Sequence, residues 1–303
     1  MQHFFRFFLR YIPIFILASV LIACQSTQTT TAPAENNTAT NDEAPLPEVV
    51  FVGQEYSFEG PESVPSGWTQ ITLDNQGELA HDLILFKLDE GKTMDDVMTV
   101  LESEQQDEDP PEWIELYGQI SADPGTRTMF IADLTPGNYG MISFGESPDG
   151  PPDAAQGMVA GLTVTNESNG ATEATLPQSE ASIELVDYSF VANGLQSGEQ
   201  LVRISNTGTE PHEVIIQRIK EGKTFAEVQA LLNAEISGEK VSDAAVEEVL
   251  EYAGSAMLAP GRVNYTHLTL EPGTYVLLCF LPSEGHEGKA HYELGMVQQV
   301  TVE

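Results

Sequence analysis

The sequence predicts an all-β protein with two Greek-key β-sandwiches, each interrupted by a small helical insertion. Short apolar segments, such as residues 275–280 and 296–302, have the length of β-strands and lie between turns rich in glycine and proline. The second half of the chain repeats the motifs of the first half in the same order. Each half has the length of one sandwich domain. We therefore expect two similar domains, in residues 48–165 and 181–303.

The repeat is visible in six pairs of short motifs that keep their order in both halves. Because residues 166–180 between the two copies are mostly small and polar, we expect them to form a linker. The pairs are Tyr56-Ser-Phe58 with Tyr188-Ser-Phe190, Asn75-Gln-Gly77 with Asn206-Thr-Gly208, His81 with His212, Glu90-Gly-Lys-Thr93 with Glu221-Gly-Lys-Thr224, Pro136-Gly-Asn-Tyr139 with Pro272-Gly-Thr-Tyr275, and Gln156-Gly-Met158 with Leu294-Gly-Met296.

The N-terminal segment has the pattern of an export signal peptide. Residues 1–23 contain two arginines, no acidic residue, and an apolar run that ends on a small residue before Cys24. The sequence Leu21-Ile22-Ala23-Cys24 resembles the bacterial lipobox. This resemblance implies cleavage before Cys24 and lipidation of Cys24, which would hold the protein on a bacterial membrane, in the periplasm or at the cell surface. Residues 24–47 carry almost no large apolar side chain, so we expect them to be a disordered tether.

The strongly negative net charge of the chain indicates which classes of partner it can bind. The sequence has 47 acidic and 12 basic residues, which gives a formal net charge of −35. Such a surface repels the phosphates of nucleic acids, whereas a basic redox protein or a basic copper-donor protein would fit it. The segment Glu221-Gly-Lys-Thr224 lacks the upstream glycine of a phosphate-binding loop, so we expect no nucleotide.

Each half is expected to contain helical segments after its Gly-Lys-Thr motif. Thr224-Phe-Ala-Glu227 has the form of a capping box, and the apolar residues that follow lie on one face at helical spacing. The same apolar face is repeated in residues 94–101. We expect a second helix over residues 242–252, with a shorter counterpart around residues 111–117.

Four residues of the second half form a candidate copper site. Cys279, His291 and Met296 lie in the last loop and at the start of the last predicted strand. His212 follows a turn and opens another apolar strand. A thiolate, a thioether and two imidazoles are donors that suit copper.

The first half lacks two of these donors. It has His81 and Met158 at the equivalent positions, but Ser143 and Asp153 replace the cysteine and the loop histidine. A blue-copper site needs a thiolate. We therefore expect the first half to be a structural or interaction module.

The stretch from Cys279 to the last strand resembles the cupredoxins, in which a histidine near the end of one strand combines with a Cys…His…Met loop before the final strand. The resemblance covers most of the chain. It implies that His212, Cys279, His291 and Met296 hold one copper ion for electron transfer or copper handling. Eleven residues separate Cys279 from His291, which is more than the family loop usually has, so His286 is an alternative ligand.

The sequence carries no motif of a copper enzyme or a hydrolase. There is no His-x-His pair as in multicopper oxidases, and Cys279 has no adjacent histidine as in copper nitrite reductases. Gly-x-Ser-x-Gly and His-Glu-x-x-His motifs are also missing. We therefore expect no enzyme. The alternative to copper binding is a metal-free extracytoplasmic scaffold or interaction protein, in which Cys279 is a small buried side chain.

Overall fold

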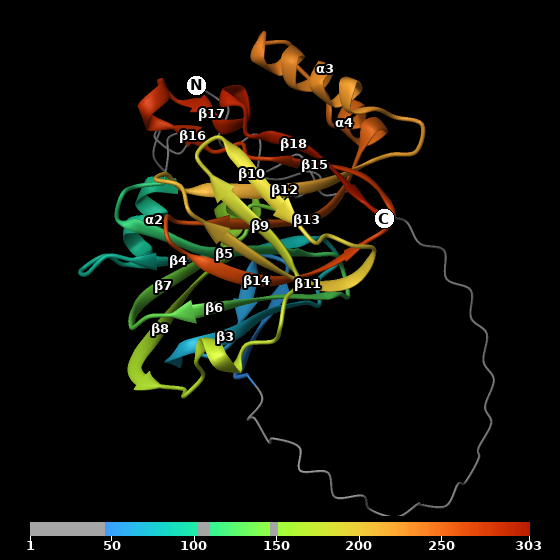
Figure 1. Ribbon diagram of the computed structural model, residues 1–303. Coiled ribbons are helices and arrows are strands. Elements are labelled where there is room, and N and C mark those ends of the chain that lie inside the picture. The colour runs from blue at the N-terminus through green and yellow to red at the C-terminus, as the bar shows by residue number, and fades with distance from the viewer. Residues whose placement is uncertain (1–45, 102–109, 146–150) are drawn as a thin grey trace, which may run out of the picture.

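The structure is a computed structural model that describes residues 46–101, 110–145 and 151–303, and these are mostly β-strands (Figure 1). The predicted signal segment, Cys24 and nearly all of the predicted tether lie outside the described residues. Within the described part, no helix is both long enough and apolar enough to cross a membrane.

The described residues of the first half form eight strands and one α-helix. They are β1 (Glu48–Gln54), β2 (Ser57–Glu59), β3 (Ser63–Asn75), β4 (His81–Leu88), α2 (Met94–Leu101), β5 (Ile114–Ala122), β6 (Arg127–Leu134), β7 (Gly137–Ile142) and β8 (Val159–Ser168), with the short 3₁₀ helix η1 (Asp153–Gln156) before β8. A second 3₁₀ helix, η2 (Glu173–Thr175), lies between the halves.

The second half contains ten strands and two α-helices. They are β9 (Ala181–Val186), β10 (Ser189–Asn193), β11 (Gly198–Asn206), β12 (His212–Ile219), α3 (Phe225–Ile236), α4 (Asp243–Val249), β13 (Leu250–Leu258), β14 (Val263–Leu270), β15 (Gly273–Leu278), β16 (Pro282–Ser283), β17 (Lys289–Ala290) and β18 (Val297–Val302), with the 3₁₀ helices η3 (Glu284–His286) and η4 (His291–Leu294) in the last loop.

The two halves share most of their strand pairings, although the pairing of β3 with β8 in the first half has no counterpart in the second. The order β5-β4-β7-β8 in the first half is repeated as β13-β12-β15-β18 in the second. The pairings of β1 with β2 and β3, and of β3 with β6, are repeated as β9 with β10 and β11, and β11 with β14. The registers agree as well, because Tyr139 lies opposite Lys87 and Leu162 just as Tyr275 lies opposite Arg218 and Val300.

One pairing joins the halves and was not predicted. Strand β14 pairs with β6 over three positions, from Asn264 opposite Ala132 to Thr266 opposite Phe130, so strands of both halves form one continuous sheet. The physical reason is that β6 and β14 are both edge strands within their own halves. Pairing them satisfies backbone groups that an open edge would leave exposed.

One of the predicted helical segments is wrong, and another forms but is shorter than predicted. The segment expected as a short helix at 111–117 instead enters strand β5 at Ile114. The helix predicted over 242–252 forms as α4 but ends at Val249, because β13 begins at Leu250. The parts that are not helical pair with a buried neighbouring strand, residues 114–116 with β4 and residues 250–252 with β12. Strand pairing and burial therefore outweigh helical spacing.

Helices α2 and α3 form where they were expected. In α3 the predicted capping box is confirmed, with the Thr224 N–H donating to Glu227 Oε2 at 2.8 Å.

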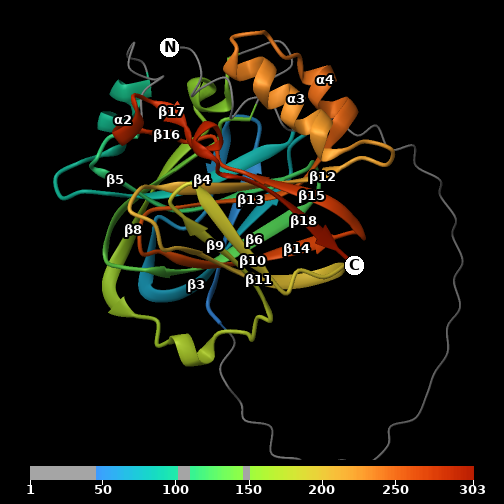
Figure 2. The ribbon, with the colours of Figure 1, turned by 45° about the horizontal axis from the view of Figure 1, so that its top comes forward.

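The sheet that carries the candidate site has both faces covered. Val214, Ile216, Leu277 and Cys279 point into the core shared with the sheet of β9, β10, β11 and β14. The alternate residues of β12 and β15 point to the opposite face, where they pack against α3 and α4. Figure 2 shows these two helices lying over β12 and β15. Cys279 therefore lies deep inside the second half rather than at its surface.

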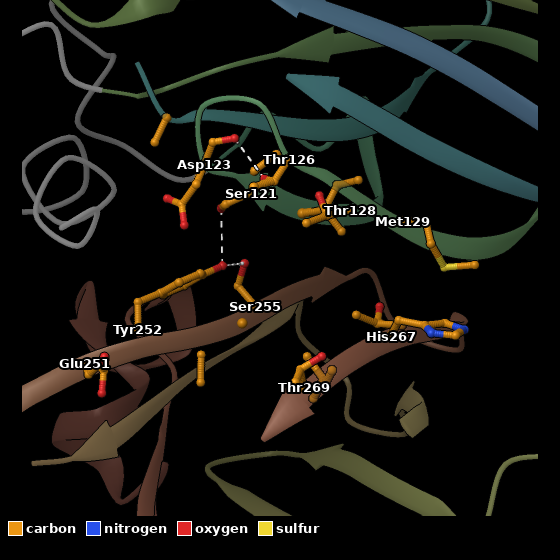
Figure 3. Close-up of a pocket in the computed structure, with 17 residues that line it drawn as sticks. Ser121, Asp123, Thr126, Thr128, Met129, Glu251, Tyr252, Ser255, His267 and Thr269 are labelled. Atoms are coloured by element: carbon orange, nitrogen blue, oxygen red, sulfur yellow. Dashed lines mark hydrogen bonds between the residues drawn. The ribbon is translucent and has the colours of Figure 1, made fainter. Parts of the chain in front are cut away.

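Side chains also join the halves around a cleft of about 360 Å³. Figure 3 shows Tyr252 and Ser255 on one wall of this cleft, facing Ser121 on the other. The Tyr252 hydroxyl donates to Ser121 Oγ at 3.2 Å, and at another point of the junction Asn264 Nδ2 donates to the Tyr117 carbonyl at 2.6 Å. These contacts fix the two halves relative to one another.

Candidate metal centre

The structure brings three of the predicted ligands together. One nitrogen of His212, the sulfur of Cys279 and one nitrogen of His291 all lie within 4.8 Å of one another. His212 Nδ1 is 2.9 Å from His291 Nδ1, and Cys279 Sγ is 3.3 Å from His291 Nδ1. All three side chains are 0% exposed. This is the one group of potential metal-ligating His, Cys, Asp and Glu residues found in the described part of the chain.

The long loop between Cys279 and His291 closes through a small hairpin. Strands β16 and β17 pair, with Pro282 opposite Ala290, so the chain leaves the site after Leu281 and returns to it at His291. The His291 N–H donates to the Leu281 carbonyl at 2.8 Å, and the Tyr292 N–H donates to the Cys279 carbonyl at 2.9 Å. The extra residues therefore form a hairpin that projects from the site. The two predicted ligands remain neighbours despite the length of the loop.

Met296, the fourth predicted ligand, is fully buried, and backbone hydrogen bonds connect it to His291 and Cys279. Its N–H donates to the His291 carbonyl at 2.9 Å, and its carbonyl accepts the Cys279 N–H at 3.2 Å. Gly295 precedes it with a φ of 115°, a conformation that favours glycine, and this turn leads the chain from η4 into β18.

His286, the alternative ligand, lies outside the cluster. Its Nδ1 is 3.0 Å from both the Tyr188 hydroxyl and Ser283 Oγ, and the residue is exposed. The geometry therefore favours His291 as the histidine of the last loop that faces the sulfur.

Two carboxylates hold the far nitrogens of the buried imidazoles. His212 Nε2 is 3.0 Å from Asp187 Oδ1, and His291 Nε2 is 3.0 Å from Glu210 Oε2. Partial burial raises the pKa of Asp187, but hydrogen bonds from His212 and Thr209 outweigh it and hold this pKa at about 2. A carboxylate in this position fixes the orientation and the tautomer of a metal-binding histidine.

Sequence reasoning did not find these carboxylates, although two signals point to them. Asp187 directly precedes the repeated Tyr-Ser-Phe motif, and Glu55 occupies the same place in the first half. Glu210 stands two residues before His212.

The protonation states of His212 and His291 favour a bound cation. Burial lowers the pKa of both histidines, and the neighbouring His212 helps to lower that of His291 to about 4, so both are neutral near pH 7. A neutral imidazole that donates its Nε2–H to a carboxylate has a lone pair on Nδ1. Two Nδ1 lone pairs at 2.9 Å cannot hydrogen-bond to each other, and the Cys279 S–H, 3.3 Å from His291 Nδ1, can donate to that nitrogen alone. His212 Nδ1 then stays a buried acceptor without a donor, which is costly. A metal ion between the imidazoles would satisfy both nitrogens.

The surroundings of the Cys279 sulfur also favour a bound cation. Burial raises the pKa of the Cys279 thiol well above its usual value, and the nearby Glu213 adds to this effect, so a thiolate needs a neighbouring cation. The Glu213 N–H points at Cys279 Sγ from 3.4 Å, and the Glu213 carboxylate accepts the Phe280 N–H at 2.7 Å. One thiolate and two imidazoles are a donor set that fits copper.

The equivalent position of the first half is closed by hydrogen bonds. His81 Nδ1 is 2.7 Å from Asp153 Oδ2, and Ser143 Oγ donates to the same oxygen at 3.0 Å. The Asp82 N–H donates to Ser143 Oγ at 3.1 Å, just as the Glu213 N–H points at Cys279 Sγ. A carboxylate thus takes the place that His291 occupies in the second half, and it binds the histidine directly.

Comparison with known proteins gave structural matches alone. No protein-family model and no curated protein matches the chain. Auracyanin A, a blue copper protein from Chloroflexus aurantiacus, is 22% identical over 40% of this chain and 98% of its own, with a TM-score of 0.26. The copper nitrite reductase from Nitrosomonas europaea is 14% identical over 84% of this chain and 93% of its own, with a TM-score of 0.23. A multicopper oxidase is 16% identical over 84% and 88%, with a TM-score of 0.22. Because these TM-scores are low, the interpretation of the site rests on its geometry.

Proposed function

We propose that the second half binds one copper ion through His212, Cys279 and His291, with Met296 as a weak further ligand, and that the protein carries electrons. The observation that carries this proposal is the pair of buried imidazoles whose Nδ1 atoms face each other at 2.9 Å beside a buried thiol. Copper in such a donor set supplies a one-electron Cu(II)/Cu(I) couple.

The surrounding residues favour electron transfer over storage or delivery of copper. Asp187 and Glu210 hold the imidazoles, the Glu213 N–H points at the sulfur, and the β16–β17 hairpin fixes the loop. A carrier benefits from a site that keeps its geometry, whereas a site that releases copper needs an accessible and mobile loop. The buried position of all three ligands also favours a carrier over an enzyme, because a substrate has no direct access to them.

The proposal includes a place for the protein in the cell. Residues 1–23 act as a signal peptide, Cys24 carries the lipid, and residues 24–47 form the tether that holds two Greek-key cupredoxin-like domains, 48–165 and 181–303, outside the cytoplasm. The acidic surface then favours a basic redox partner.

Replacement of Cys24 by serine should abolish lipidation and release the protein from membranes. Detergent partitioning measures this, and a cleaved variant that still partitions wholly with membranes would contradict the anchor.

The copper proposal is tested by titrating the purified protein with Cu(II). We expect one copper per chain and an intense visible band from charge transfer between sulfur and metal. Cys279→Ser should abolish the band, whereas His81→Ala in the first half should leave it unchanged. A protein that stays colourless and also takes up no Cu(I) would refute the proposal in favour of the metal-free scaffold.

A further inference from the structure

The proposed copper ligands are not exposed, so a partner protein cannot contact them directly. His212, Cys279 and His291 are each 0% exposed, and carboxylates cover the outer nitrogens of both imidazoles. Because the proposed function requires electrons to leave the site, another side chain must connect the ligands to the surface.

Tyr188 makes this connection on the His291 side. Its ring lies edge-on to the His291 ring, with 5.3 Å between the centroids, and edge-on to the His286 ring at 5.1 Å. Tyr188 is partly exposed and His286 is exposed. Three aromatic rings therefore run in continuous contact from the buried ligand to the protein surface.

A chain of hydrogen bonds follows the same course. Glu210 accepts from His291 Nε2 through Oε2 and from the Tyr188 hydroxyl and Ser283 Oγ through Oε1, the last two at 3.1 Å. The hydroxyl and Ser283 Oγ each lie 3.0 Å from His286 Nδ1. These contacts hold the exposed imidazole in one orientation against Tyr188, although the hairpin that carries it is on the surface.

The charges around His286 indicate the kind of partner. Glu287 and Glu293 are exposed in the same loop, and the side chains of Asp187 and Glu210 are 32% and 26% exposed. Lys289 is the one lysine or arginine between β15 and β18. A positively charged surface would therefore be attracted to this face of the molecule.

We infer that the face around His286 is the docking surface for a positively charged redox partner, and that electrons pass between this partner and His291 by way of His286 and Tyr188. The inference rests on the proposed copper site. It assigns His286 a function other than metal ligation, and it gives the long loop a purpose, which is to carry a surface imidazole to a site that has none.

The test follows oxidation of the Cu(I) protein by tris(phenanthroline)cobalt(III), a cationic one-electron oxidant. The protein loses one electron, cobalt(III) becomes cobalt(II), and no bond or proton is transferred. The rate is measured from the return of the visible band. We expect His286→Ala and Tyr188→Leu to slow the reaction several-fold, and Tyr188→Phe, which keeps the ring, to slow it less. His267→Ala, which removes an exposed histidine on β14, should have no effect.

A second measurement does not depend on electron transfer. The redox-inert paramagnetic cation tris(ethylenediamine)chromium(III) should broaden the NMR signals of the His286 ring more than those of His267. The energy of the visible band and the reduction potential should stay the same in His286→Ala, because His286 is not a ligand.

The two proposals fail in different ways. If no band forms with Cu(II), the copper site is refuted and the route is refuted with it. If the band forms normally but His286→Ala and Tyr188→Leu are oxidised as fast as the unaltered protein, the route alone is wrong. If His286→Ala slows copper uptake and leaves the oxidation rate unchanged, His286 guides the metal into the site and the route is again wrong.

Discussion

At the scale of single residues, the site is defined as much by its two carboxylates as by its three proposed ligands. The donor residues were predictable because cysteine and histidine are rare in this chain, whose sequence has 2 cysteines and 6 histidines. The carboxylates could not be singled out in the same way, because 47 acidic residues surround them in the sequence. Their role appears only when the fold places Asp187 and Glu210 against the two imidazoles.

Removal of one carboxylate should weaken the metal site without removing it. Asp187→Ala leaves the His212 Nε2–H without its acceptor, so the imidazole is less basic and less fixed. We expect copper affinity to fall by roughly 10- to 100-fold, the range typical of such partners. Competition with a chelator measures the affinity, and Asp187→Asn, which keeps an acceptor oxygen, should lose less. An unchanged affinity in Asp187→Ala would show that the carboxylate plays no part in binding.

A buried acid in the first half should make stability depend on pH. Burial raises the pKa of Asp82 to about 6, although a hydrogen bond from Ser121 opposes it. The folded protein then keeps this proton up to about pH 6, whereas the unfolded chain releases it near pH 4. The group therefore favours the folded state below pH 4, and that stability is lost as the pH rises from about 4 to about 6, by on the order of 3 kcal/mol at most.

Urea unfolding at several pH values tests this expectation. Asp82→Asn should remove the loss of stability between pH 4 and pH 6, because the amide has no proton to release. Asp133→Asn, at an exposed position on β6, serves as the control and should leave the profile unchanged. If Asp82→Asn has the same pH profile as the unaltered protein, the buried carboxyl is not the cause.

At the scale of elements, the regular strands and capped helices follow from local pattern, and the exceptions follow from tertiary contacts. The capping box at Thr224 satisfies backbone groups within a few residues, so the sequence alone predicts it. Residues 111–117 carry no such local signal, and their state is decided by pairing with β4 more than twenty residues away. The sequence could not predict the β16–β17 hairpin either, because two-residue strands give no periodic pattern.

The turn that delivers Met296 should depend on glycine. Gly295 has a φ of 115°, and its counterpart Gly157 has a φ of 110°, so both halves use the same turn. A methyl group at Gly295 would meet the Tyr188 carbonyl at an ordinary 3.7 Å, which leaves backbone strain as the main cost of Gly295→Ala. We expect a loss of about 1–3 kcal/mol in the free energy of unfolding and weaker copper binding.

The matched control is Gly161→Ala on β8, where φ is not positive and the nearest atom is 3.7 Å away. That substitution should change stability little. Urea midpoints measured for both variants decide the matter, and equal stability would mean that the turn relaxes at Gly295 without strain.

At the scale of the whole molecule, the chain carries one arrangement of side chains twice, once with the proposed copper ligands and once without them. Ser143 and Asp153 stand where Cys279 and His291 stand, within the same backbone hydrogen bonds: the Ser143 N–H donates to the Met158 carbonyl at 3.1 Å, as the Cys279 N–H does to the Met296 carbonyl at 3.2 Å. The sequence predicts this correspondence because the repeat is in register. It does not predict the shared sheet, because the edges of β6 and β14 look like any other edge strands.

The double substitution Ser143→Cys and Asp153→His should therefore create a second copper site. We expect two copper ions per chain instead of one, and a stronger visible band. The new site should be the weaker one, because Leu79 stands where the second half has Glu210 and the new imidazole lacks a carboxylate. Either single substitution alone is the control and should leave one copper per chain. A double variant that folds and still binds one copper would show that the two backbones differ where the ligands attach.

The shared sheet also links the stability of the first half to that of the second. Because β6 and β14 pair directly and side chains cross the junction, one half cannot melt without breaking contacts of its neighbour. Any ligand bound by the native state raises the melting temperature of everything that unfolds with it. Copper held at residue 279 should thus protect residues 48–165 from heat, so that a calorimeter records one transition that moves upward as a single peak when the metal is added.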